Sequence, residues 1–172
     1  MFKKKPVQML KLPTSEYSLL FVLALVLLLG GCGSDHAEKR QHEVADRGTE
    51  VMPFDLDRTT HIFEKLENGG MQQVLSDDQD ADQIQRIQAH LEEEAGRFSQ
   101  GDFHDPAMIH GHDMPGLHEL VMGYDKMSIV YSELENGGQI LYTTQDSSMV
   151  VAVHTWFDAQ LADHGDHAQG HH

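Results

Sequence analysis

Histidine and methionine side chains that could bind a metal gather in one stretch of the chain, residues 99–126. Imidazole nitrogen is a good ligand for zinc, copper and nickel, and the thioether sulfur of methionine selects Cu(I). The candidate ligands in this stretch are His104, Met108, His110, His112, Met114 and His118. Their spacing matches no fixed zinc signature, so composition alone predicts a transition-metal site here. The alternative is an ordered loop that packs over the edge of a sheet.

Two further groups of histidines extend this prediction. The C-terminal stretch holds His164, His167, His171 and His172, and a histidine-rich tract of this kind is a compositional signal of metal binding. We expect residues 166–172 to form a mobile tail that binds metal weakly. His61 falls on the inward face of a predicted strand and is the last candidate ligand. Its alternative is a structural histidine of the core.

The chain is strongly acidic. It holds 28 Asp and Glu residues against 12 Lys and Arg residues, which gives a formal net charge of −16. An acidic surface repels phosphate backbones, so we expect no nucleic-acid partner. The charge suits cations or basic partners, and a solvated surface that maintains solubility explains it equally well. The single cysteine, Cys32, excludes an intrachain disulfide.

The N-terminus has the features of an export signal. Several lysines precede an apolar run at residues 19–29. This run is shorter than the roughly 20 apolar residues that cross a bilayer and is typical of a signal-peptide core. The sequence Leu29-Gly30-Gly31-Cys32 resembles the lipobox of bacterial lipoproteins. The resemblance implies that residues 1–31 are a signal peptide and that Cys32 carries acyl chains such as palmitate.

The residues around Cys32 also indicate a location. More than one acyl chain gives stable membrane attachment. Gly33 follows the cysteine where an Asp would resemble an inner-membrane retention signal, so we expect an outer-membrane anchor facing the periplasm. An uncleaved short anchor is the alternative. Residues 32–57 lack apolar periodicity and contain many charged or small residues, which predicts a flexible tether.

A repeated pentapeptide organises the rest of the chain. Leu-Glu-Asn-Gly-Gly occurs at residues 66–70 and again at residues 134–138. Asn-Gly-Gly between two strand-like runs is a strong hairpin signal, because the turn needs residues that tolerate positive φ. An amphipathic helical pattern follows each copy, at residues 80–98 and 147–162.

These patterns predict one domain at residues 58–165. It would contain a hairpin-helix unit at 58–98, the connector at 99–126 and a second hairpin-helix unit at 127–163. We expect an α+β fold of ββα-ββα order, with a four-stranded antiparallel sheet and two helices on one face.

Alignment of the two units shows where they differ. The strands align at an offset of 68 residues, which places Ile129 at the position of His61. The apolar stripes of the helices align at an offset of 66 residues, which places Trp156 at the position of His90. The repeat therefore predicts a common scaffold without a symmetric pair of histidine ligands.

Residues 52–165 resemble a family of uncharacterised secreted bacterial proteins. The resembling stretches are Met52-Pro53-Phe54-Asp55-Leu56-Asp57, Thr59-Thr60-His61-Ile62-Phe63, Gly101-Asp102-Phe103, Asp105-Pro106-Ala107, Ile109-His110-Gly111, Met114-Pro115-Gly116-Leu117, Trp156-Phe157-Asp158-Ala159-Gln160 and His164-Gly165. Members of this family are often labelled aspartate carbamoyltransferase. The chain contains no Ser-Thr-Arg-Thr phosphate loop, so the resemblance implies a fold and a compartment but no catalytic residues.

Three functions remain open from the sequence. The first is a lipid-anchored extracytoplasmic domain that binds or buffers copper, zinc or nickel. The second is an envelope module that binds a protein partner, with histidines that respond to pH. The third is a small enzyme, for which the sequence shows no nucleophile and base in a recognisable arrangement.

Overall fold

The computed structural model describes residues 32–171, and it describes side chains from 35 to 170. The predicted signal peptide and His172 lie outside the described residues. The chain divides after His36 into two units, and everything below concerns the unit that begins at Ala37. The α-helices are α2 (Cys32–Val51), α3 (Ala81–Phe98), α4 (His104–His110), α5 (Leu117–Gly123) and α6 (Ser147–His164). The strands are β1 (Thr59–Leu66), β2 (Gly69–Ser76), β3 (Met127–Leu134), β4 (Gly137–Thr144) and β5 (Ala168–His171). Short 3-10 helices are η1 (Leu56–Arg58), η2 (Tyr124–Lys126) and η3 (Gly165–His167).

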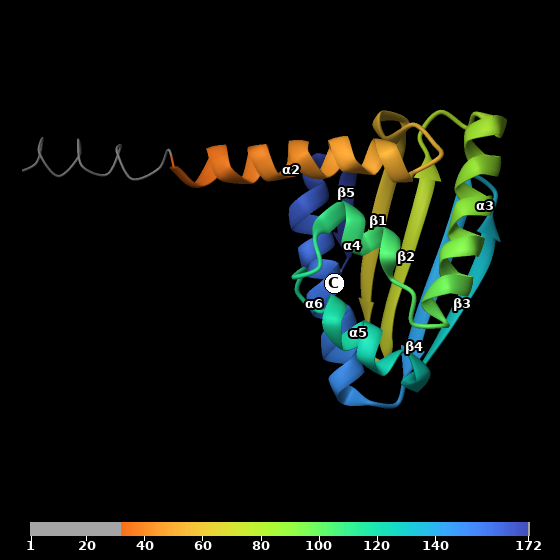
Figure 1. Ribbon diagram of the computed structural model, residues 1–172. Coiled ribbons are helices and arrows are strands. Elements are labelled where there is room, and N and C mark those ends of the chain that lie inside the picture. The colour runs from red at the N-terminus through yellow and green to blue at the C-terminus, as the bar shows by residue number, and fades with distance from the viewer. Residues whose placement is uncertain (1–31, 172) are drawn as a thin grey trace, which may run out of the picture. The chain divides into compact units, whose positions relative to one another are not determined.

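The five strands form one sheet in the order β3-β4-β2-β1-β5 (Figure 1). The three pairings among the four hairpin strands are antiparallel, whereas β5 pairs parallel to β1. Helix α3 packs on β3 and β4, and α6 packs on β1 and β2. Each helix therefore covers the hairpin of the other unit. As a result α3 and α6 lie on the same face of the sheet, and one hydrophobic core fills the space between the helices and the sheet.

The repeated pentapeptide explains how the two hairpins join. The register of β2 and β4 pairs Gln72 with Ile140, two residues that are themselves 68 positions apart, so a local two-fold axis passes through this pair. The carbonyl oxygens of Asn68 and Asn136 accept hydrogen bonds from the backbone of Thr144 and Ser76. Each turn is thus fastened to the end of the other hairpin.

Glycine is required next to each turn because the two hairpins approach closely there. A Cβ atom on Gly69 would lie 2.0 Å from the carbonyl oxygen of Tyr142. A Cβ atom on Gly137 would lie 2.0 Å from the carbonyl oxygen of Val74. The two contacts are equivalent, so the repeated Gly-Gly serves the junction between hairpins as well as the turns.

The two long helices begin and pack in the same way. Asp80 caps α3 and Asp146 caps α6. The side chain of each accepts hydrogen bonding from backbone N–H in the first turn of its helix. The apolar stripe of α3 buries Ile87, Leu91 and Phe98. The matching face of α6 buries Val153, Trp156 and Phe157.

The α+β class is confirmed, and the expected numbers of strands and helices were wrong. The sheet has a fifth strand because residues 168–171, predicted as a mobile tail, pair with the free edge of β1. Pairing satisfies backbone groups that the edge of β1 would otherwise leave to water. The connector contains α4 and α5, and its Phe103, Ile109 and Leu117 are buried.

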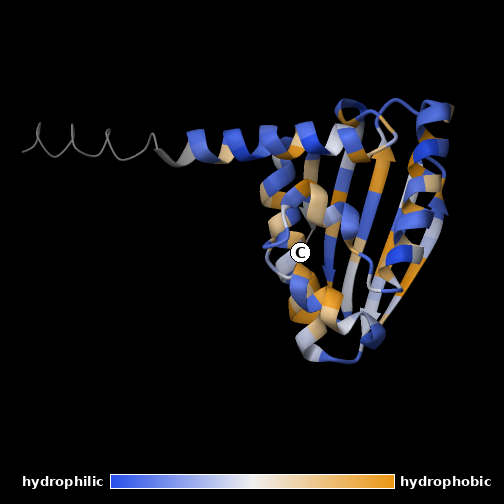
Figure 2. Cartoon of the chain, in the orientation of Figure 1, coloured by the Kyte–Doolittle hydropathy of each residue, from blue (hydrophilic) through white to orange (hydrophobic). Residues whose placement is uncertain are grey.

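The prediction of a flexible tether was wrong for residues 32–51, which form α2. Figure 2 shows that α2 is mostly hydrophilic, which is why its sequence lacks an apolar stripe. The helix is held by specific contacts instead. Val44 is buried, the Arg47 guanidinium donates to the carbonyl oxygen of Ile109, and the Gln41 amide donates to that of Ala162. None of the helices within residues 32–171 combines the length and the apolar character that crossing a membrane takes.

Candidate functional site

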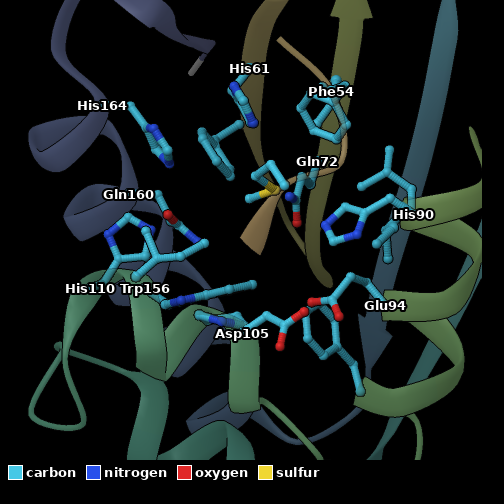
Figure 3. Close-up of a pocket in the computed structure, with 18 residues that line it drawn as sticks. Phe54, His61, Gln72, His90, Glu94, Asp105, His110, Trp156, Gln160 and His164 are labelled. Atoms are coloured by element: carbon cyan, nitrogen blue, oxygen red, sulfur yellow. The ribbon is translucent and has the colours of Figure 1, made fainter. Parts of the chain in front are cut away.

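Three histidines from separate elements converge above the sheet (Figure 3). His61 lies on β1, His110 is the last residue of α4, and His164 is the last residue of α6. The rings of His61 and His164 stack with centroids 4.8 Å apart. The ring of His110 stands nearly perpendicular to that of His164, with centroids 5.1 Å apart. His164 is therefore the central member of the cluster.

Two helix ends position His110 and His164. Gly111 follows α4 with φ of 97°, and Gly165 follows α6 with φ of 55°. Both glycines adopt positive φ at the end of their helix. The backbone N–H of Gly111 donates to the carbonyl oxygen of Ala107, and that of Gly165 donates to the carbonyl oxygen of Leu161. Each helix consequently stops at a histidine whose side chain turns toward the core.

Arg40 and Asp163 fix the orientation of His110. The carboxylate of Asp163 lies 2.8 Å from Nδ1 of His110, and it also accepts hydrogen bonds from both Nε and Nη2 of Arg40. Nη2 of Arg40 further donates to the carbonyl oxygen of His110 at 3.1 Å. Burial acts to raise the pKa of Asp163, but the hydrogen bonds from His110 and Arg40 outweigh it and hold that pKa below its usual range. A hydrogen bond from Nδ1–H of His110 to this carboxylate selects the tautomer of neutral imidazole whose lone pair is on Nε2.

His61 and His164 are held neutral by their surroundings. His61 is 3 % exposed, and neither of its ring nitrogens has a hydrogen-bond partner. Burial, with a smaller effect of His110, lowers the pKa of His61 to about 4. Burial and the neighbouring His61 likewise hold the pKa of His164 well below its usual value. Neutral imidazole is the form that binds a metal.

The histidine cluster forms one wall of a cavity of about 30 Å³, room for one water molecule or one ion. The opposite wall carries His90, Glu94 and Asp105, and Trp156 and Gln160 lie between the walls (Figure 3). The indole Nε1 of Trp156 and the amide oxygen of Gln160 are buried without a partner. Buried polar atoms are almost always hydrogen-bonded, so unpaired ones that share a cavity indicate a ligand site.

The acidic wall holds a proton at neutral pH. Burial, followed by the charge of Asp105, raises the pKa of Glu94 to about 8. Arg97 lies 3.2 Å from the Glu94 carboxyl and 3.0 Å from that of Asp105, and it also binds Asp102. At neutral pH Glu94 is therefore a protonated hydrogen-bond donor, with Asp105 beside it.

The separations within the histidine cluster fit a shared metal ion. Two imidazoles bound to one metal at about 2.0–2.1 Å have centroids roughly 4.5–5.2 Å apart for bond angles between 90° and 110°. The observed 4.8 and 5.1 Å lie in this range. Among residues 32–171, no group of three or more His, Cys, Asp or Glu side chains is placed so that it could hold a metal ion as the side chains stand. Rotation of the rings about their side-chain bonds would be needed to aim three nitrogens at one point.

The other predicted ligands lie elsewhere. His104, His112 and His118 are exposed and line a separate surface hollow. Met108 is 49 % exposed, whereas Met114 is buried in the core. His167 is exposed beside the cluster, and His171 belongs to β5. The structure thus joins His61, His110 and His164 and separates them from the remaining candidates.

Several residues of the site escaped the sequence prediction. Arg40, His90, Glu94, Gln160 and Asp163 were not among the expected ligands or their partners. The dipeptide His-Gly at 110–111 and 164–165 was an available signal, since glycine often ends a helix. Nothing local linked Arg40 to Asp163, which is 123 positions away.

Comparison of the chain with protein families, with curated proteins and with solved structures found no match. The resemblance to proteins labelled aspartate carbamoyltransferase stays a prediction. Function is therefore inferred from the geometry of the histidine cluster and its cavity.

Proposed function

We propose that this protein binds a transition-metal ion, copper, zinc or nickel, through His61, His110 and His164. Copper, zinc and nickel ions all bind imidazole nitrogen well. The cluster would bind the ion at the edge of the buried cavity. Glu94 and Asp105 would then lie across the cavity from the ion.

One observation carries the proposal: His61 is buried with both ring nitrogens unpaired and stacks on His164, and His164 also contacts His110, whose Nδ1 is fixed by a carboxylate. Metal-bound histidines commonly donate their second nitrogen to a carboxylate, which fixes the ring and raises its basicity. The pair His110–Asp163 has this arrangement, with Arg40 holding the carboxylate in place. A histidine that served packing alone would gain nothing from two unpaired nitrogens.

We propose further that Cys32 carries the lipid and holds the protein at the outer membrane facing the periplasm. Residues 1–31 lie outside the described residues, so the support for this proposal is the sequence alone. That support is the lipobox-like sequence that ends at Cys32. Growth with radiolabelled palmitate should label the wild-type protein and leave the Cys32→Ser variant unlabelled. Equal labelling of both proteins would refute the lipid anchor.

The metal proposal is tested by equilibrium dialysis against Cu²⁺, Zn²⁺ and Ni²⁺. His164→Phe installs the residue that α3 carries at the equivalent position, Phe98, and removes the central ligand. We expect its affinity to fall by more than about 100-fold, since loss of a ligand exceeds the roughly 10–100-fold cost of losing a ligand's partner.

The control is the triple variant His104→Ala, His112→Ala and His118→Ala, which removes three exposed imidazoles where His164→Phe removes one. Its affinity for the tightest ion should stay within about threefold of the wild type. The proposal fails if the triple variant loses binding while His164→Phe retains it, or if the wild type binds none of the three ions more tightly than about 10 μM.

A further inference from the structure

A second cavity meets the histidine cluster from the solvent side. It has a volume of about 340 Å³ and lies between α2, β1 and the C-terminal end of α6. His61 and His164 line this outer cavity and the inner cavity alike. Met52 and Ile109 also line both cavities, so the stacked histidine rings form part of the partition between the two spaces.

The rim of the outer cavity carries its own ligand groups. His42 comes from α2, Asp57 from η1, and Asp166 and His167 from η3. All four side chains are exposed. Imidazole with carboxylate suits zinc, nickel and copper(II), and the two carboxylates give the rim a negative charge at neutral pH.

His61 provides an independent sign that this cavity leads to a ligand site. It is 3 % exposed, lines the outer cavity, and has no partner for either ring nitrogen. His42, Asp57, Asp166 and His167 line the same outer cavity as His61 and His164. The exposed rim and the two cluster histidines therefore face one shared space.

We propose that the outer cavity is a loading site, where His42, His167, Asp57 and Asp166 capture a divalent transition-metal ion and pass it to His61 and His164. This inference rests on the proposed function, because it needs the buried cluster to be the destination. The rim residues are exposed and water competes for the captured ion, so they hold it briefly. A negatively charged cleft raises the local concentration of cations and their rate of arrival.

A loading site changes the rate of binding and leaves the affinity alone. The capture groups do not contact the ion when it is free in solution or when it is bound at the histidine cluster. They therefore speed binding and release of the ion by the same factor. Removal of both rim histidines should therefore slow uptake and release by the same factor. Groups that belong to the final site would instead change the equilibrium constant.

Trp156 makes the test direct. It is the single tryptophan, is fully buried, and lines the inner cavity together with His110 and His164. Cu²⁺ quenches a tryptophan close to it, so quenching reports arrival at the buried cluster. Stopped-flow mixing of Cu²⁺ with the wild type and with His42→Ala/His167→Ala would give the two uptake rates.

We expect the double variant to load at least about tenfold more slowly, to reach the same final quenching, and to keep its Kd within about twofold. The control is His104→Ala/His112→Ala, which removes two exposed histidines outside the outer cavity and should load at the wild-type rate. Equal rates for the wild type and the rim variant would overturn the loading site. So would a loss of affinity that matches the loss of rate, because it would make the rim histidines part of the final site.

Failure of the underlying function gives a different result. If Cu²⁺ binds in dialysis without quenching Trp156, or if none of Cu²⁺, Zn²⁺ and Ni²⁺ binds, the buried cluster is not the destination and both proposals fall. If quenching occurs and only the rates are insensitive to the rim, the metal site stands and the loading site alone is refuted.

Discussion

The two hairpin-helix units share a framework and differ where they face the cavity. Helices α3 and α6 are each 18 residues long and both begin after a capping Asp. At the offset of 66 residues, three cavity-facing positions hold different side chains in the two helices: His90, Glu94 and Phe98 in α3 against Trp156, Gln160 and His164 in α6. Because the scaffold is common, these differences reflect the site and not the fold.

The strands show the same contrast. His61 on β1 occupies the position of Ile129 on β3. β1 is flanked by β5 and lies beneath the histidine cluster, whereas β3 is an outer strand of the sheet. The first hairpin thus supplies a histidine to the cluster where the second hairpin has Ile129. The cluster therefore lies on only one side of the local two-fold axis.

The largest effect should come from breaking the common framework. Gly69→Ala and Gly137→Ala each place a Cβ atom 2.0 Å from a backbone carbonyl oxygen, so one hairpin must shift. We expect each to lower the free energy of unfolding by more than about 4 kcal/mol, the extreme end of single substitutions. Urea denaturation measures this.

Gly96 in α3 is the control, because a Cβ atom there meets nothing within 4 Å. Gly96→Ala should stabilise the protein by about 0.5–1 kcal/mol, as expected for a helix interior. A large cost for one junction glycine and none for the other would show that the two halves are not equivalent at their junction.

The second prediction exchanges a residue between units at β1. The folded pKa of His61 is about 4, below its unfolded value, so the unfolded chain takes up the proton first as pH falls. The contribution of His61 to stability is full above about pH 6.5 and is lost between pH 6.5 and pH 4, by about 3 kcal/mol. His61→Ile, which copies Ile129, should remove this loss.

The measurement is the free energy of unfolding of metal-free protein at pH 7, 5.5 and 4. Exposed His112→Ala is the control and should retain the wild-type slope. Parallel curves for wild type and His61→Ile would contradict the burial of a neutral imidazole at this position.

The third prediction concerns Asp163, the hydrogen-bond partner of His110. Helix α3 has Arg97 at the equivalent position, so the first unit has no such carboxylate. Asp163→Asn keeps the size of the side chain and removes the charge that fixes the Nδ1–H tautomer and binds Arg40. Metal affinity should fall by about 10–100-fold. Asp158→Asn on the same helix, where Asp158 is exposed and pairs with Lys65, should leave the affinity unchanged. Equal affinities for the wild type and Asp163→Asn in dialysis would remove Asp163 from the site.

The smallest effect should come from Glu94→Gln, which copies Gln160 into α3. The folded pKa of Glu94 is about 8, above its unfolded value, so the folded state loses stability as pH rises from about 4.5 to 8. Gln does not ionise, so the variant should be more stable than the wild type at pH 9. We expect about 1–2 kcal/mol, less than the full shift, because the variant also forgoes the ion pair with Arg97. A variant less stable than the wild type at pH 9 would contradict the raised pKa of Glu94, because it would show that the ionised carboxylate stabilises the folded state.

The sequence predicted the scaffold better than its edges. Both hairpins lie where Asn-Gly-Gly indicated, and both long helices follow their apolar stripes. Helix α2 was missed because it is held by a few polar contacts and one fully buried valine, Val44. Strand β5 was missed because its partner, β1, is more than 100 positions away, and short strands carry little local signal.

The site was predicted in part, because composition gives ligand types without their positions. His61, His110 and His164 were among the expected ligands, as were His104, His112 and His118. A following glycine distinguishes His110 and His164 locally, and no local pattern distinguishes His61. The difference arises from tertiary structure. His110 ends α4 facing the core, whereas His112 stands two residues beyond on the surface.

The most direct test observes the imidazole nitrogens themselves. Protein labelled with ¹⁵N at histidine can be followed by NMR as one equivalent of Zn²⁺ is added, with assignment by single His→Phe variants. The account predicts that the ring-nitrogen signals of His61, His110 and His164 shift together and saturate at one equivalent, while those of His104, His112 and His118 stay in place. Shifts confined to the exposed histidines, with the three buried rings unchanged, would contradict it.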